Sequence, residues 1–182
     1  MRIRSGSVEL RAFEPALSEA LHAVRNHPSV RRNLRDPQPI ARESHERWVR
    51  ENLIEARNLH LFLVFSAGAA AGIALLRDFR GREAEIGVMI VDPERHRLLA
   101  YVAAHLVGYY AFEVLELDRL LSRVPLQHAQ ALEFNLNCGF EPTGQASALY
   151  HVLSLSKERS REHAAHKRFR RTRKIEVEVE NL

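Results

Sequence analysis

A strand-like run that passes into a long helix is the sequence feature that most constrains the fold of this chain. Residues 86–91 form an apolar run of strand length, and Asp92-Pro93 ends it. From Leu98 to Leu115, apolar residues recur at intervals of three and four, which predicts an amphipathic helix. Where a strand leads into a helix N-terminus, backbone N–H groups can hold an anion. The junction therefore predicts an α/β chain with an anion-binding loop.

The other expected elements lie on both sides of this junction. Before it the sequence predicts a strand, two helices and two strands, at residues 8–13, 16–26, 40–56, 60–65 and 71–78. After the long helix it predicts a strand, a helix and a last strand or pair of strands, at residues 119–124, from residue 127, and at residues 146–155. A chain of 182 residues fits one domain, which we place at residues 1–156.

The positive charge of the chain is concentrated in a C-terminal arm, residues 157–182. Residues 157–174 hold nine Lys or Arg against two Glu, a net charge of +7, whereas the whole chain carries +4. Phe169 is the aromatic residue of this run, so we expect a solvated helix or disordered arm, with nucleic-acid contact as an alternative. Residues 175–180 alternate, which predicts a strand paired with a sheet edge, its own or that of a second subunit in a homodimer.

Cysteine content and hydropathy bear on the cellular setting. Cys138 is the single cysteine, so an internal disulfide is excluded and a reducing cytoplasm is the simplest expectation. The first residues lack the apolar core of a signal peptide. Residues 61–76 carry no charge, but the run is shorter than the roughly 20 residues that a spanning helix needs. We therefore expect no membrane span.

Three short motifs carry a resemblance to a known family. Tyr110-Ala111-Phe112, residues 117–120 and Cys138-Gly139-Phe140 follow the junction at spacings that resemble those of the GNAT acyl-CoA-dependent N-acyltransferases. The similarity extends from about Val8 to about Leu155. It implies a mixed, mostly antiparallel sheet of about seven strands, flanked by helices and split near strands four and five to admit acyl-CoA. It also implies transfer of an acetyl group from acetyl-CoA to a primary amine.

The resemblance assigns a cofactor site to the same junction. The backbone of Met89, Ile90 and Val91 would bind the pantetheine arm. The phosphate loop would consist of Arg95, His96, Arg97, Leu98 and Ala100. Leu98 and His96 depart from family glycines, and a Cβ there can obstruct the approach of a pyrophosphate. The neighbouring arginines offer charge-assisted contacts that would offset this loss.

Catalysis by N-acyl transfer needs a base near the amine and a proton source for the leaving thiolate. The resemblance places the base at Glu85, with Glu83 as the second choice. The structural alternative for Glu85 is a strand-edge carboxylate that faces solvent or pairs with an arginine. Asn135 occupies the position at which the family has a tyrosine that protonates the thiolate. His128 occupies the position at which the family has an asparagine. His128, Tyr150 or a water would then supply the proton, and a structural role is the alternative for each residue.

The acceptor side is expected at the first two helices. Asn26, His27, His45 and Trp48 resemble the corresponding region of two GNAT branches, the amino-sugar acetyltransferases of the pseudaminic acid pathway and the ribosomal-protein N-terminal acetyltransferases. We favour an amino sugar as the acceptor, nucleotide-linked as in the first of these branches. A protein N-terminus or a small metabolite is the second choice. A helix stop at His27-Pro28 is the structural alternative.

A different class of function is also compatible with the sequence. Loss of the family's glycine and tyrosine fits a catalytically degenerate binding module whose basic arm contacts nucleic acid or an acidic partner. Cys138 is expected to be a small core residue, since nothing near it in sequence would stabilise a thiolate. His163 and His166 lack a third ligand, so we expect no zinc or other metal.

Overall fold

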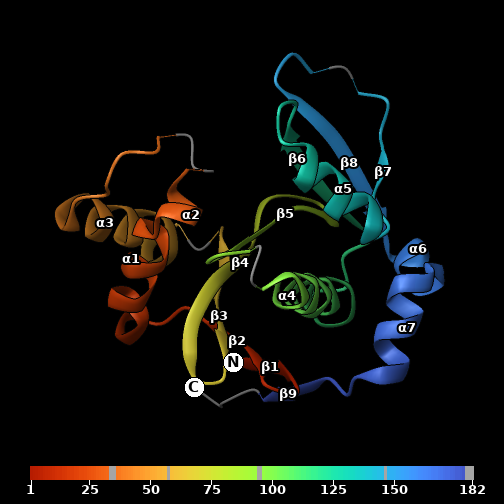
Figure 1. Ribbon diagram of the computed structural model, residues 1–182, viewed down its shortest axis with the longest axis horizontal. Coiled ribbons are helices and arrows are strands. Elements are labelled where there is room, and N and C mark those ends of the chain that lie inside the picture. Colours follow the sequence, from red (N-terminus) through yellow and green to blue (C-terminus); the bar gives the residue numbers. More distant parts are fainter. Residues whose placement is uncertain (33–35, 57, 94–95, 146, 179–182) are drawn as a thin grey trace.

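The structure is a computed structural model that describes residues 1–32, 36–56, 58–93, 96–145 and 147–178 (Figure 1). Its centre is one mixed sheet in the order β7-β8-β6-β5-β4-β3-β2-β1-β9. Neighbouring strands pair antiparallel except β5 and β6, which are parallel. The α/β class and the mostly antiparallel mixed sheet are confirmed. The expected count of about seven strands was wrong, because the described residues form nine.

The bounds of the elements follow the sequence pattern closely. The strands are β1 Arg2–Ser5, β2 Val8–Ala12, β3 His60–Ser66, β4 Ala69–Arg80, β5 Glu83–Ile90, β6 Arg119–Pro125, β7 Glu141–Pro142, β8 Tyr150–Ser156 and β9 Glu176–Glu178. The helices are η1 Pro15–Leu17, α1 Ser18–Asn26, α2 Pro28–Arg31, α3 Arg42–Val49, η2 Arg50–Glu55, α4 Arg97–Tyr109, η3 Tyr110–Val114, α5 Ala129–Asn137, α6 Lys157–Glu162 and α7 Ala164–Thr172. The unexpected strands β1 and β7 are four and two residues long, too short for a recognisable alternation.

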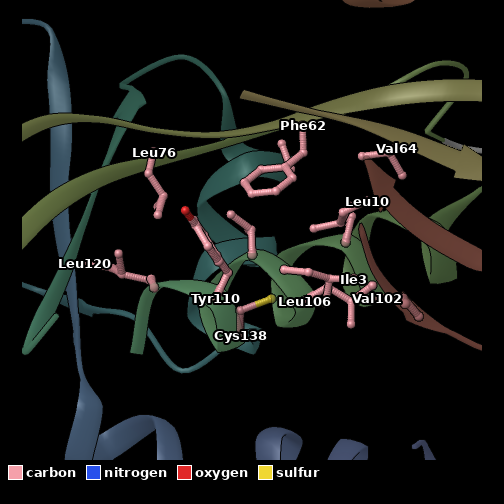
Figure 2. Packing of buried hydrophobic residues seen from close by; sticks show 14 of the residues in the cluster. Ile3, Leu10, Phe62, Val64, Leu76, Val102, Leu106, Tyr110, Leu120 and Cys138 are labelled. Carbon is pink, nitrogen blue, oxygen red and sulfur yellow. The ribbon is translucent and has the colours of Figure 1, made fainter. Parts of the chain in front are cut away.

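Helices cover both faces of the sheet and divide the core in two. On one face α4 packs against the sheet, and Figure 2 shows Phe62 and Leu76 of the strands pointing toward Leu106 and Tyr110. On the other face α1, α2 and α3 cover part of the sheet, with Leu21 and other apolar residues packed on β3 and β4. Side chains of one strand alternate between these two cores. Each residue of β5 therefore belongs to a known face.

The strands β5 and β6 separate soon after they meet. Their parallel pairing joins Glu83–Glu85 to Arg119–Leu121. Beyond Glu85, β5 continues to Ile90 paired with β4, and β6 continues to Pro125 paired with β8. In Figure 1 the β6 and β8 part of the sheet leans away from β5. The sheet is therefore split between its fourth and fifth central strands, counted from β2.

The C-terminal arm is packed on the body rather than solvated. Its helices α6 and α7 bury Ser160, His166 and Phe169, and Phe169 joins the α4 core. Because Phe169 is buried, the aromatic that could have stacked on a nucleic-acid base is not exposed. The predicted edge pairing is confirmed for the described part of the segment, since β9 pairs with β1 of the same chain through Ile3 and Val177. Sequence periodicity missed the packing of the arm because Phe169 is the single large apolar residue of residues 157–174, so no repeating apolar pattern is present.

No helix in the described part of the chain is long and apolar enough to cross a membrane. Residues 61–76, the longest uncharged run considered above, form most of β3 and β4 and the turn between them. Leu61, Leu63 and Ile73 face the α1–α3 core, whereas Phe62, Val64 and Ala74 face the α4 core. The run is apolar because both faces of these central strands are covered.

Candidate active site

The split between β5 and β6 leaves one edge of β5 without a strand partner. Residues Met89 and Ile90 pair with β4 through Ile73 and Gly72, and the amide of Val91 donates to the carbonyl of Ala71 at 2.9 Å. On the opposite side, the described ladder with β6 ends at Glu85. Backbone groups of residues 86–90 on that side are thus available to an extended ligand. This is the edge that we expected to bind a pantetheine arm.

The part of β5 without a β6 partner ends at Ile90, and α4 begins seven residues later at Arg97. His96 is the N-cap residue, and its side chain makes no capping hydrogen bond with the described residues, so it leaves the first-turn backbone N–H groups available to an anion. Leu98 is 61% exposed, so its side chain extends into solvent instead of filling the loop. Ala100 is half-buried against the α4 core. Arg95 lies outside the described residues, and the structure does not describe the side chain of Arg97.

A hydrogen bond ties the end of β5 to the helices of the other face. The amide of Asp92 donates to the hydroxyl of Ser29 in α2 at 2.9 Å. His27 precedes α2 and accepts from the Ser29 amide through Nδ1 at 3.4 Å, which caps this short helix. His27 therefore helps hold α2 beside the point where the chain leaves β5. It lies near the split but has a capping role of its own.

Glu85 is the most buried charged residue at the split. Its side chain is 4% exposed and faces the α1–α3 side, opposite Arg77 on β4. Arg77 donates to Oε1 through Nη2 at 2.5 Å and through Nε at 3.2 Å. The Nη1 atom of Arg123, on β6, contacts Oε2. Two guanidinium groups from the neighbouring strands thus hold the carboxylate that we predicted to be the base.

Glu83 lies two residues earlier on the same face and is less enclosed. Its Oε1 atom is 3.3 Å from Nη1 of Arg119, the residue opposite it on β6, and its side chain is 38% exposed. An exposed ion pair of this kind is worth little, so the carboxylate can exchange partners readily. Glu83 is thus the more accessible of the two predicted bases, at the closed end of the split.

The residues expected on the acceptor side make local contacts within and between the helices of that face. Asn26 donates to the carbonyl of Ile40 at 2.9 Å and accepts from its amide at 2.8 Å, which closes the chain between α1 and α3. His45 is buried, and its Nε2 lies 3.0 Å from the carbonyl of Ser18. Burial lowers the pKa of His45. Trp48 stacks under Arg25, whose guanidinium carbon is 3.9 Å from the ring centroid. The contacts of His45 and Trp48 therefore join α3 to α1.

The comparisons with known proteins agree with this architecture. A family model described as an acetyltransferase (GNAT) domain matches residues 7–141, most of the chain. The chain belongs to the GNAT acetyltransferase family. It is accordingly an acyltransferase. A search of curated protein sequences found no match.

Solved structures of GNAT proteins share the fold at low sequence identity. The apo form of FdhC, described as a nucleotide-linked sugar GNAT, is 18% identical with a TM-score of 0.76, covering 92% of this chain and 97% of its own. A variant of the spermidine N-acetyltransferase SpeG from Vibrio cholerae is 18% identical with a TM-score of 0.69, covering 87% and 97%. A Vibrio cholerae protein described as a candidate ribosomal-protein-serine acetyltransferase is 21% identical with a TM-score of 0.66, covering 86% and 97%.

The GNAT positions on α5 have local structural roles in this chain. His128 is the N-cap of α5, and its Nδ1 accepts from the amide of Ala131 at 3.2 Å. Asn135 donates to the carbonyl of Ala131 at 2.8 Å within the same helix. Tyr150 is 39% exposed at the start of β8, opposite Pro125. The structural alternatives considered for His128 and Asn135 are thus present, and Tyr150 is exposed.

Sequence reasoning missed the two arginines that pair with Glu85. Arg77 and Arg123 lie within predicted strands, and a charge inside a strand is a signal that could have identified them. Pairing them with Glu85 requires the register of both neighbouring strands.

Elsewhere, burial raises the pKa of the Cys138 thiol to about 12, in keeping with a core residue. In the described part of the chain no group of three His, Cys, Asp or Glu could hold a metal ion.

Proposed function

We propose that this GNAT enzyme transfers an acetyl group from acetyl-CoA to the primary amine of an amino sugar, free or nucleotide-linked. One observation carries the proposal: the part of β5 that has no β6 partner leads in sequence to the N-terminus of α4, where the N-cap side chain makes no capping hydrogen bond. An extended thioester arm can therefore lie along β5 while its phosphates reach the helix. A protein N-terminus suits this site less well as the acceptor, because it lacks phosphate or carboxylate oxygens next to its amine.

The described residues fit acetyl-CoA at both ends. Residues 86–90 present a strand edge for the pantetheine amides, and Met89, Ile90 and Val91 are fixed from the other side by β4. The first-turn amides of α4 suit the pyrophosphate, because the helix dipole favours negative charge there. The exposed side chain of Leu98 leaves this approach open. The family departure at Leu98 therefore does not close the phosphate loop.

Acetyl-CoA supplies a thioester whose carbonyl carbon is attacked by the acceptor amine. In the balanced reaction the C–S bond breaks, an amide C–N bond forms, the amine loses one proton and the leaving sulfur gains one. The chain's part is to admit the amine as its free base and to bind both reactants in line. Glu83 is the more accessible carboxylate for the proton, since the proton must compete with two guanidinium groups for Glu85.

The choice of acceptor rests on charge and on similarity. The open face beside the split carries Arg77 and Arg123, whose exposed guanidinium groups disfavour a cationic polyamine. They suit an acceptor that carries phosphate or carboxylate oxygens, such as a nucleotide-linked amino sugar. The likeness to FdhC supports the same choice at the level of fold. A protein N-terminus lacks such oxygens next to its amine.

Calorimetry with acetyl-CoA tests the proposal first. We expect a dissociation constant in the micromolar range, which corresponds to about −8 kcal/mol. Replacing Arg97, at the start of α4, by Ala should weaken binding about tenfold, or roughly 1.4 kcal/mol. The matched control is Arg170→Ala, which removes an exposed arginine from α7 on another part of the molecule and should leave binding unchanged.

Turnover over a panel of amines then tests the reaction. The panel contains an amino sugar, its nucleotide-linked form, an N-terminal peptide and spermidine, and release of the CoA thiol is the readout. We expect the two sugar acceptors to be preferred. No heat and no thermal shift with millimolar acetyl-CoA would overturn the proposal. Binding without transfer to any amine would favour a GNAT binding module.

A further inference from the structure

We propose that Arg77 and Arg123 bind an anionic group of the acceptor and that Glu85 is the positioning residue that holds both arginines. The inference rests on the proposed acyl transfer and names the chemistry of its acceptor, phosphate or carboxylate oxygens close to the reacting amine. It also gives Glu85 a role different from that of the general base.

The three side chains share one face of the sheet. Arg77 follows Ile73 and Leu75 at two-residue steps on β4, and these two residues face the α1–α3 core. Glu85 is directly opposite Arg77. On β6, Leu120 and Val124 face the α4 core, so Arg123 faces the other way. All three side chains therefore stand on the α1–α3 side of the split.

Their position coincides with the apex of the split. The β5–β6 ladder ends at Glu85 and Leu121, and Arg123 is the next residue of β6 that faces the same side. A thioester placed between the strands reaches its innermost point there. An acceptor that approaches from the α1–α3 side consequently meets Arg77 and Arg123 first.

Burial distinguishes the carboxylate from the two cations. The Glu85 side chain is 4% exposed, whereas those of Arg77 and Arg123 are 54% and 35% exposed. A ligand on this face therefore contacts the guanidinium groups and not the carboxylate. Asp78 lies 3.8 Å from Arg123, beyond hydrogen-bond distance, and is itself exposed. It leaves the outward side of Arg123 accessible.

The arginines retain unused hydrogen-bond donors. A guanidinium group has five N–H donors in a fixed fork. Glu85 occupies Nε and Nη2 of Arg77 and contacts Nη1 of Arg123. Within the described part of the chain, Nη1 of Arg77 and the Nε and Nη2 atoms of Arg123 donate no hydrogen bond. Two adjacent forks with free donors match the oxygens of a phosphate or carboxylate group.

Glu85 makes this arrangement possible. Two guanidinium groups repel each other, and an anion between them is needed to hold them close. The buried carboxylate of Glu85 supplies that negative charge from the protein side of the two guanidinium groups. It thereby holds both arginine side chains in place. A carboxylate engaged in this way is a poor proton acceptor, which separates positioning from base catalysis.

Binding of a matched pair of amines tests the anion site directly. The probes are glucosamine and glucosamine 1-phosphate, titrated by calorimetry in the presence of CoA, which cannot donate an acetyl group. We expect the phosphate to improve affinity at least about tenfold. In Arg77→Gln and Arg123→Gln the two probes should bind within about twofold of each other. Equal binding by the unmodified chain overturns the proposal.

The controls isolate the two arginines and the kind of anion. Arg82→Gln removes an exposed arginine that pairs with Asp118 at 2.7 Å beyond the closed end of the split, and it should preserve the phosphate preference. Loss of the preference in this variant would overturn the assignment to Arg77 and Arg123. The third probe, 2-amino-2-deoxyglucuronic acid, replaces phosphate by carboxylate. If it binds better than glucosamine 1-phosphate, the anionic acceptor is supported and its anion is assigned as a carboxylate.

Kinetics of Glu85→Gln separate a positioning residue from a base. A positioning role predicts that KM for the phosphorylated acceptor rises about tenfold or more while the acidic limb of the kcat pH profile is kept. Loss of that limb with an unchanged acceptor KM would make Glu85 the base and overturn its assignment. If Glu85→Gln does not fold, Arg123→Lys serves instead, since it keeps the charge and loses the fork, and phosphate preference should fall.

The outcomes also distinguish this inference from the proposed function. Equal turnover of glucosamine and its phosphate leaves the acetyltransferase intact and removes the anion site. If no amine is acetylated, the calorimetric comparison with CoA still decides whether the arginines bind the phosphate.

Discussion

Arg77 and Glu85 lie directly opposite each other on β4 and β5, and Nη2 of Arg77 donates to Oε1 of Glu85 at 2.5 Å. Arg123 contacts the second carboxylate oxygen from β6. The ion pairs thus connect three neighbouring strands at the point where the sheet divides. Because the carboxylate is buried and the guanidinium groups are not, the cluster contributes to folding and also presents cations to a ligand.

Replacing Glu85 by Gln should destabilise the fold measurably. The change leaves two guanidinium groups side by side without their anion, and hydrogen bonds to charged groups contribute about 1.5 to 3 kcal/mol each. Solvent screens the exposed arginines, so we expect a loss of about 1 to 3 kcal/mol in the free energy of unfolding. Urea unfolding of Glu85→Gln measures this loss, and Glu83→Gln is the control. Removing the exposed ion pair of Glu83 should lower the free energy of unfolding by less than about 1 kcal/mol.

Gly72 is a second point on which the cofactor strand depends. A Cβ added there would lie 2.5 Å from the carbonyl oxygen of Met89 and 2.6 Å from Cδ1 of Ile90. Gly72→Ala should therefore displace the end of β5, cost about 1 to 3 kcal/mol of stability and weaken acetyl-CoA binding. Calorimetry and urea unfolding measure the two effects.

Gly108 provides the matched control for Gly72. It lies within α4, and apart from its two chain neighbours and the backbone of its own helix, no atom of the described residues is within 4 Å of a Cβ added there. Gly108→Ala should stabilise the chain by about 0.5 to 1 kcal/mol, because alanine favours helix. Acetyl-CoA binding should be unchanged. Equal effects of the two substitutions would show that the close approach at Gly72 is unimportant.

Stability should fall in mild acid because His105 is buried. Burial, and then the charge of His166, lowers the pKa of His105 to about 3, against 6.5 for the exposed group. The unfolded chain thus binds the proton more tightly. The contribution of neutral His105 is fully present above about pH 6.5, and up to about 1.4 kcal/mol per pH unit is lost as the pH falls from there toward 3.

Urea unfolding at about pH 7.5, 6 and 5 measures this slope. The Nδ1 atom of His105 donates to the carbonyl of Tyr101 at 2.8 Å, and the ring stacks on Phe169 with centroids 4.5 Å apart. His105→Phe keeps a ring in this place and removes the titration. Its stability should change less with pH, and an identical slope in both proteins would contradict the assignment to His105.

Release of the C-terminal arm should expose Cys138. Phe169 is 4% exposed in the core, and the ring of His166 reaches the carbonyl of Cys138 at 2.8 Å. Phe169→Ala should cost about 3 to 5 kcal/mol and loosen α7 first, because Phe169 is one of the two buried side chains of this helix. The Cys138 thiol, 2% exposed, should then react faster with a thiol reagent. Arg170→Ala, on the exposed side of α7, should leave the rate unchanged.

Protection of β9 from hydrogen exchange should depend on its inward side chain. Val177 is opposite Ile3, packs against the α4 core and is half-buried. Val177→Asp places a charge there, so the amides of β9 and of β1 should exchange faster. Glu178→Ala removes an outward ion pair with Arg4 of 3.9 Å and should keep most of the protection. Rapid exchange of β9 in the unmodified chain would argue against the β1–β9 pairing in solution.

The sequence by itself determined the central part of this fold. The apolar run before Asp92-Pro93 and the helical period after Leu98 are local patterns, and β5 and α4 occupy nearly those residues. Alternation over residues 175–180 likewise predicted an edge strand, found as β9. Local patterns succeed here because each of these elements buries one face. The apolar residues of that face recur at a regular interval in the sequence, so the element can be recognised from it.

Only the tertiary structure decided the chemistry around these elements. Glu85 was predicted from its place on one strand, but its ion pairs come from Arg77 and Arg123 on two others, 8 and 38 positions away. The burial of Phe169 likewise depends on contact with α4, far away in sequence. A single charged residue in a strand, or a single aromatic residue in a polar segment, forms no repeating sequence pattern. The sequence therefore does not show which residue it contacts. Strand register and helix docking bring such partners together, and these are properties of the whole folded chain.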